Sequence, residues 1–113
     1  MKFAFVSDIH ANLQAWRAVW PDTIAHNVDR VICLGDIVGY GPKPAETLTA
    51  VYSKADYFVV GNHDAAVAGL FDASQFSDDA QRMIAWTRER LGSQAFDFIK
   101  KLPYAFQIDA GGF

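Results

Sequence analysis

The sequence lacks several features that would mark a secreted, membrane-bound or nucleic-acid-binding protein. Its single cysteine, Cys33, cannot form a disulfide within the chain and lies in an apolar run, as a buried strand thiol would. The first apolar run, residues 3–6, ends at Ser7, and no run approaches the ~18 residues of a membrane span. Acidic residues outnumber basic ones by 13 to 10, so no net positive charge attracts nucleic acid or anionic lipid. We therefore expect a cytoplasmic protein without membrane contact or strong nucleic-acid binding.

The sequence does contain an alternation of short apolar runs and helical patterns. With 113 residues, of which 51% are hydrophobic, the chain can bury one core. The apolar runs at residues 3–6, 30–34 and 57–60 are too short for helices and are typical of buried strands. A helix capped by Asn12 follows the first run, and a helix starting at Pro44 follows the second. This order predicts an α/β fold with a βαβαβ unit, whose parallel strands end at one common edge.

The helical patterns predict where the helices begin and which faces they bury. Pro21 should kink or restart the first helix because it lacks a backbone N–H. Farther along, Ser77 caps one helix, and Ser93 starts another that Pro103 stops. The apolar stripe of the first helix is expected to consist of Leu13, Trp16, Val19, Trp20 and Ile24.

The last ten residues suggest one arm of a hairpin. Residues 104–108 alternate between larger apolar and other side chains, which is typical of a half-buried strand. Gly111 and Gly112 then form a dipeptide that is favoured in two-residue hairpin turns. Phe113 would open the return strand, so this arm is expected to leave an unpaired edge.

Polar side chains gather at the predicted carboxyl end of each of the three strands. They occur in three motifs: Asp8-Ile9-His10, Gly35-Asp36-Ile37-Val38-Gly39 and Gly61-Asn62-His63-Asp64. Ligands of open α/β sheets bind at the edge where parallel strands end. One such cluster could arise by chance, but three at successive strand ends indicate a functional site.

The donor atoms of these motifs suit divalent cations. They are carboxylate and amide oxygens with imidazole nitrogens, and no thiolate is among them, which favours Mn²⁺, Fe, Zn²⁺ or Mg²⁺. Asp36, in the middle motif, is the natural candidate to bridge two cations about 3.5 to 4 Å apart. Such a pair attracts a phosphate and lowers the pKa of bound water.

In order and spacing, the three motifs resemble the first signatures of the calcineurin-like metallophosphoesterases, and especially the small bacterial and archaeal phosphodiesterases. The resemblance implies a two-sheet sandwich flanked by helices and a dinuclear site, with Mn²⁺ favoured. It implies that Asp8 and His10 bind the first metal, that Asp36 bridges both and that Asn62 binds the second. His63 would contact the phosphoryl group as an electrostatic stabiliser or general acid, and a metal-bridging hydroxide would attack phosphorus in line.

The sequence departs from the family pattern at two places. The protein Ser/Thr phosphatases carry an Asp and an Arg where this chain has Gly39 and Tyr40, so phosphodiesters become the expected substrates. The family completes its metal site with a further His and a Gly-His-x-His motif, and no histidine follows His63. We therefore expect residues 1–113 to be the N-terminal part of a metallophosphoesterase domain, poorly active alone.

Several alternatives stay open at this point. Asp64 could stabilise a helix N-terminus or act on His63, and Asn12 could cap a helix or contact substrate. Tyr40 could line the substrate mouth or only fill a turn. The function could be hydrolysis of a small phosphoester, a protein Ser/Thr phosphatase-like reaction, or a non-catalytic scaffold role. A homo-oligomer is a further expectation.

Overall fold

The computed structural model describes residues 1–70 and 72–112, and its centre is a parallel three-stranded sheet. The strands are β1 (Phe3–Val6), β2 (Arg30–Cys33) and β3 (Tyr57–Phe58), in the spatial order β1-β2-β3. Phe5 pairs with Ile32 across the first ladder, and Cys33 pairs with Phe58 across the second. The predicted βαβαβ unit is therefore confirmed.

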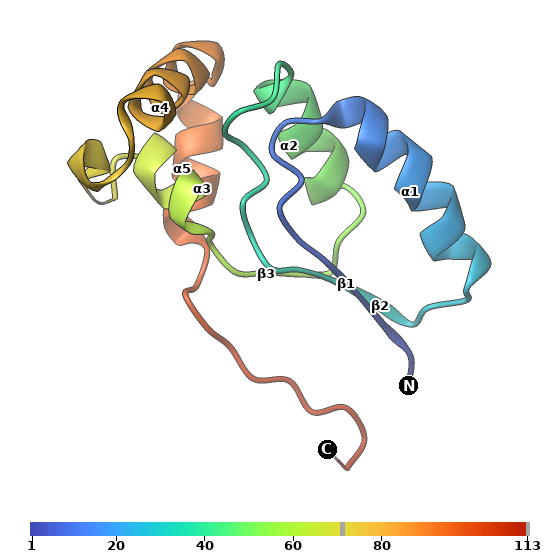
Figure 1. The fold of residues 1–113 in the computed structure, drawn as a ribbon. Helices are drawn as coiled ribbons and strands as arrows, with labels where there is room; N and C mark the ends of the chain where they lie inside the picture. Colours follow the sequence, from blue (N-terminus) through green and yellow to red (C-terminus); the bar gives the residue numbers. More distant parts are fainter. Residues whose placement is uncertain (71, 113) are drawn as a thin grey trace.

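The helices lie on one side of this sheet. In Figure 1, α1 and α2 lie above the strands, and the later helices lie beyond β3 on the same side. Among the described residues, no helix is both long and apolar enough to cross a membrane. The helical segments are α1 (Leu13–Ala25), α2 (Pro44–Tyr52), α3 (Asn62–Val67), the 3₁₀ helix η1 (Ala73–Gln75), α4 (Asp78–Arg90) and α5 (Ser93–Lys101).

The ends of the helices follow the capping residues in the sequence. The Asn12 side chain accepts a hydrogen bond from the Ala15 N–H at 3.0 Å, and the Ser77 hydroxyl accepts one from the Ala80 N–H at 3.2 Å. Pro44 is the first residue of α2, where its missing N–H leaves no bond unmade. These predicted starts are confirmed.

The core fills the space between the sheet and the helices. Its members come from the strands, from the loop after β2 and from α1 to α5, so residues far apart in sequence share one apolar interior. The largest fully buried apolar side chains include Ile37, Val38, Val51, Val67 and Ile99, and the Cys33 thiol is buried among them.

The structure bears on two predictions for the first helix. Pro21 lies inside α1, which continues to Ala25, so the helix does not restart there, and a kink at Pro21 stays a prediction. One missing hydrogen bond does not end the helix, because the preceding turns are fixed by Trp16, buried and stacked on Trp20 with ring centroids 5.5 Å apart. The expected stripe is too wide, since Val19 is 50% exposed and Ile24 is 55% exposed.

The C-terminal segment does not form the predicted strand. Residues 104–108 pair with no strand among the described residues, and Phe106 instead stacks on Tyr57 with centroids 5.4 Å apart. The strand β3 is also shorter than expected and ends at Phe58, although the Val59 N–H still bonds to the Cys33 carbonyl at 3.0 Å. A strand needs a ladder partner, which alternation alone does not supply.

The predicted hairpin turn is replaced by a local turn around one carboxylate. Asp109 Oδ1 accepts hydrogen bonds from the N–H groups of Gly111 at 2.9 Å and Gly112 at 3.4 Å. This is the pattern of an Asx turn, in which a side-chain carboxylate takes the place of a backbone carbonyl as the acceptor. The predicted return strand at Phe113 lies outside the described residues.

Candidate metal centre

Three loops meet at the carboxyl ends of the strands. The loop after β1 is bound to the loop after β2 by hydrogen bonds from the N–H groups of Asp8, His10 and Ala11 to the carbonyls of residues 35, 36 and 37, at 3.1, 3.0 and 2.7 Å. The Gly41 N–H returns a bond to the His10 carbonyl at 3.0 Å. The two loops therefore behave as a short ladder that continues the sheet into the site.

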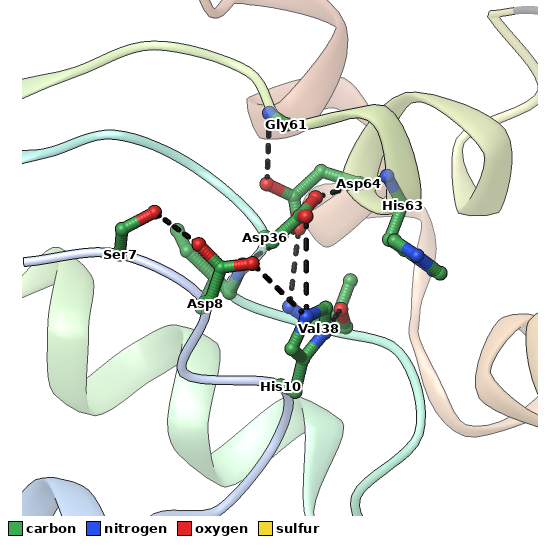
Figure 2. Close-up of polar contacts among 9 residues, drawn as sticks. Ser7, Asp8, His10, Asp36, Val38, Gly61, His63 and Asp64 are labelled. Atoms are coloured by element: carbon green, nitrogen blue, oxygen red, sulfur yellow. Dashed lines mark hydrogen bonds and ion pairs between the residues drawn. The ribbon is translucent and has the colours of Figure 1, made fainter.

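The side chains at this edge are presented by backbone in the left-handed region. The φ angles are +54° at Asp8, +50° at His10 and +53° at Asp36, although none of these residues is glycine. Such conformations are uncommon for residues with a Cβ and persist where the surroundings fix them. The bonds between the loops supply that constraint, and they turn all three side chains toward one another (Figure 2).

Glycine is required where the loops touch. A Cβ on Gly61 would collide with the backbone nitrogen and carboxylate of Asp36, and a Cβ on Gly41 would collide with the His10 carbonyl. Neither glycine needs a positive φ, so close approach alone explains them. The third loop, which ends at Gly61, is thereby packed directly against the residue predicted to bridge two metals.

Asp8, His10 and Asp36 form one group of possible metal ligands. One ligand atom from each lies within 4.8 Å of the others. The His10 Nε2 atom lies 3.5 Å from Asp8 Oδ1 and 3.9 Å from Asp36 Oδ2. Two donors that each lie about 2.1 Å from one ion are about 3.0 to 4.2 Å apart, depending on the bond angle. The two distances that involve His10 fall in this range, so the three side chains could hold a single divalent cation.

Backbone and side-chain contacts orient these ligands. His10 Nδ1 lies 3.2 Å from the Val38 carbonyl, so an Nδ1–H would donate to it and leave the Nε2 lone pair facing the carboxylates. The Asp36 Oδ1 atom accepts a hydrogen bond from the His63 N–H at 2.9 Å. The Ser7 hydroxyl donates to Asp8 Oδ2 at 2.5 Å, which fixes the most exposed of the three ligands.

The second predicted metal position is less defined. Asn62 is the first residue of α3 and is exposed. It follows Gly61 directly, which is packed against Asp36, so the chain brings this amide to the same edge of the sheet. Its assignment as a ligand of a second ion stays a prediction.

His63 is buried and lies within a cluster of rings. Its ring centroid lies 5.1 Å from that of His10, 4.8 Å from that of Tyr40 and 5.0 Å from that of Phe76. Burial lowers its pKa from the ordinary value, Asp36 opposes this shift, and His10 adds to it. Figure 2 shows the His63 backbone nitrogen toward Asp36 and the ring directed away from that carboxylate. The imidazole is therefore placed beside the group of three ligands rather than within it.

Asp64 fastens the third loop to the second. Its Oδ1 atom accepts hydrogen bonds from the N–H groups of Ile37 at 2.9 Å and Val38 at 3.1 Å, and its Oδ2 atom accepts one from Gly61 at 3.2 Å. Burial raises the pKa of this carboxyl to about 6, while the backbone donors lower it. Of the two predicted roles, the structure places Asp64 at the N-terminus of α3, where the capping bond to Gly61 forms.

Asn12 and Tyr40 are the remaining candidates, each with two predicted roles. Asn12 caps α1 through its side-chain oxygen, as the first of its two predicted roles requires. Tyr40 is half exposed and lies against the His10 and His63 rings, so it is at the site rather than in a remote turn. Whether it contacts substrate stays a prediction.

Sequence reasoning missed two contributors to the site. The Val38 carbonyl orients His10, and no side-chain pattern reports such a backbone contact. Phe76 packs on His63 from the segment between η1 and α4, and its distance in sequence hides the contact. For the Val38 carbonyl, the only signal in the sequence was the turn that Gly35 and Gly39 predict.

Comparisons with known proteins agree with this geometry. The family model for calcineurin-like phosphoesterases matches residues 1–112. The chain is 35% identical over 109 residues to "Uncharacterized protein MJ0912" of Methanocaldococcus jannaschii, covering 96% of this chain and 45% of that protein. It therefore spans less than half the length of that relative.

Two solved structures share the fold. The crystal structure of a metallophosphoesterase from Sphaerobacter thermophilus has a TM-score of 0.74 at 39% identity, over 91% of this chain and 42% of that one. A putative diadenosine tetraphosphatase has a TM-score of 0.66 at 20% identity, over 90% of this chain and 43% of that one, and at this identity it supports the fold alone.

Proposed function

Because this chain belongs to the calcineurin-like phosphoesterase family, we propose that it provides the N-terminal metal ligands of a dinuclear phosphodiesterase. The observation that carries the proposal is the convergence of Asp8, His10 and Asp36 within one ion's reach. We also propose that residues 1–113 belong to a longer domain that adds ligands for the second ion, since the relatives are about twice as long.

Each residue has a distinct part in this proposal. Asp8, His10 and Asp36 hold the first cation, preferably Mn²⁺, and Asp36 with Asn62 contributes to the second. Bound cations would lower the pKa of a bound water and attract the phosphate. His63 would contact the phosphoryl group as an N–H donor, and burial lowers the pKa of its imidazole.

The substrate class follows from the groups around the site. Among the described residues, no hydrogen bond or ion pair joins a Lys or Arg side chain to Asp8, His10, Asp36 or His63. A phosphate monoester dianion needs more positive charge than a diester anion. A diester is therefore the better match, and a phosphoprotein the poorer one.

Metal binding can be tested on the 113-residue chain itself. We expect calorimetric titration with Mn²⁺ to show one tight site per chain, because three ligands converge at the first position and fewer at the second. Asp36→Ala should abolish this site, whereas Asp97→Ala, which removes an exposed carboxylate from α5, should leave it intact. Two tight sites in the unaltered chain would contradict the proposed need for further ligands.

Activity should be measured in the longer protein with bis(p-nitrophenyl) phosphate and Mn²⁺. Excess chelator should abolish turnover, and Asp36→Ala should lower it more than any other single ligand change. His63→Ala should lower kcat by about 10²- to 10³-fold and retain the metal content. Turnover that persists in excess chelator would refute the mechanism, and a metal-binding protein without any turnover would favour a scaffold role.

A further inference from the structure

Tyr40 is an exposed aromatic ring at the site that the proposed reaction leaves without a role. Half of its surface is exposed, at 50%. Its ring centroid lies 5.2 Å from that of His10 and 4.8 Å from that of His63. The ring therefore contacts two residues of the site, while half of the residue's surface stays exposed.

The backbone holds this ring in an unfavourable conformation. Tyr40 has a φ of +64°, in a left-handed region that bulky residues rarely adopt because it is strained. The turn is fixed on both sides, because the Gly41 N–H bonds to the carbonyls of His10 and Gly39 at 3.0 and 2.8 Å. A glycine or asparagine would satisfy such a turn without this strain. The turn alone therefore does not account for a tyrosine.

The hydroxyl group is not what anchors the residue. No hydrogen bond to the Tyr40 oxygen is found among the described residues, and the contacts of the side chain are ring contacts. A half-exposed ring that is already ordered loses little conformational entropy when it binds a second flat group. Stacking of a base or aryl ring on such a side chain strengthens binding by about 5- to 160-fold.

We propose that Tyr40 is a stacking platform for an aromatic group of the substrate, such as a nucleobase or an aryl ester, next to the phosphate. This inference rests on the proposed function, because it places the phosphate at the metal ligands. Tyr40 thereby determines specificity, through affinity for the aromatic group, and takes no part in bond cleavage.

The test compares two ligands that differ only in the ring. Phenyl phosphate and methyl phosphate are monoesters of the kind that diester hydrolysis releases, and both carry the same phosphate group, so as product ligands they should contact the metals alike. We expect calorimetry on the Mn²⁺-loaded longer protein to show that phenyl phosphate binds at least about fivefold more tightly. In Tyr40→Ala the two affinities should become equal, and Tyr40→Phe should restore the preference.

A matched control and a second measurement separate stacking from a structural role. Tyr104→Ala removes a tyrosine that is 73% exposed and lies outside the site, so it should retain the preference for phenyl phosphate. Tyr40→Ala should also keep the wild-type affinity for Mn²⁺. A joint loss of Mn²⁺ affinity would mean that Tyr40 only orients His10 and would overturn the inference.

The outcomes distinguish this inference from the function on which it rests. If the unaltered protein binds neither ester and does not hydrolyse bis(p-nitrophenyl) phosphate with Mn²⁺, the proposed function fails. If it binds both equally, or if Tyr40→Ala retains the preference, the function stands and the stacking role of Tyr40 is refuted.

Discussion

Buried hydrogen bonds hold the edge of the sheet that carries the three loops. The face of the sheet opposite the helices instead exposes large apolar side chains. At the loop edge, Asp64 is 1% exposed and each of its carboxylate oxygens accepts backbone hydrogen bonds. On the opposite face, Phe5 is 63% exposed and Leu34 is 45% exposed, and both line a groove of about 340 Å³ together with the C-terminal segment.

This difference shows that residues 1–113 hold the metal ligands in place by themselves but leave one face of the sheet uncovered. The geometry of Asp8, His10 and Asp36 depends on bonds between neighbouring loops of the same chain. The open face has no comparable network, because the C-terminal segment crosses it without pairing to a strand among the described residues. The metal ligands can therefore be arranged before that face is covered, and the following predictions test this division.

The largest effect is expected for Asp64→Ala. The change leaves the N–H groups of Ile37, Val38 and Gly61 without their acceptor in a buried place, so the free energy of unfolding should fall by at least about 3 kcal/mol. Urea unfolding of the 113-residue chain measures it. Asp72→Ala removes an exposed carboxylate that accepts bonds from Ser74 and should cost less than about 1 kcal/mol. Equal losses would refute the special role of the loop edge.

Two glycines test whether the loop edge is more sensitive to substitution than the rest of the chain, with a smaller expected loss of stability. Gly61 and Gly92 are both N-cap residues with extended backbone, before α3 and α5. A Cβ at Gly61 would collide with Asp36, whereas a Cβ at Gly92 meets no atom within 4 Å. Gly61→Ala should destabilise the chain by about 1 to 3 kcal/mol and weaken Mn²⁺ binding. Gly92→Ala should change stability by no more than about 1 kcal/mol, and a similar loss at both sites would contradict the packing argument.

The open face should cause the 113-residue chain to self-associate weakly. Among the residues that the structure describes, the edge strand β1 pairs only with β2, and Phe5 adds exposed apolar surface beside it. We expect Phe5→Ser to raise the concentration at which dimers form in sedimentation velocity, with Mn²⁺ binding unchanged. Val19→Ser, at a half-exposed position of α1, is the control and should have no such effect. Identical association of the two variants would move the interface away from the sheet.

The sequence was sufficient for the parts of the fold that depend on local patterns. The run lengths and the capping residues Asn12, Ser77 and Pro44 predicted the strands and helix starts, because capping and burial act within a few residues. The placement of Asp8 and Asp36 at one edge followed from the parallel topology.

The parts that could not be predicted depend on contacts between distant segments. Residues 104–108 alternate like a strand, yet a strand requires a partner that the pattern does not name. The helix α3 was missed because its six residues are buried almost all round and show no helical periodicity. The left-handed backbone at Asp8 and Asp36 likewise has no sequence signal, since glycine, its usual marker, is absent there.

The smallest expected effect concerns Cys33, which lies in the core between the two regions. Burial raises its thiol pKa from 9.0 to about 11, so the folded state binds this proton more tightly than the unfolded state does. Its stabilising contribution is therefore complete below about pH 9 and is lost as the pH rises toward 11. At pH 10 the loss should be about 1 kcal/mol relative to pH 8. Cys33→Ala lacks this group, so its stability should fall less over the same pH range in urea unfolding, and parallel pH profiles for the two proteins would show that the thiol does not titrate differently on folding.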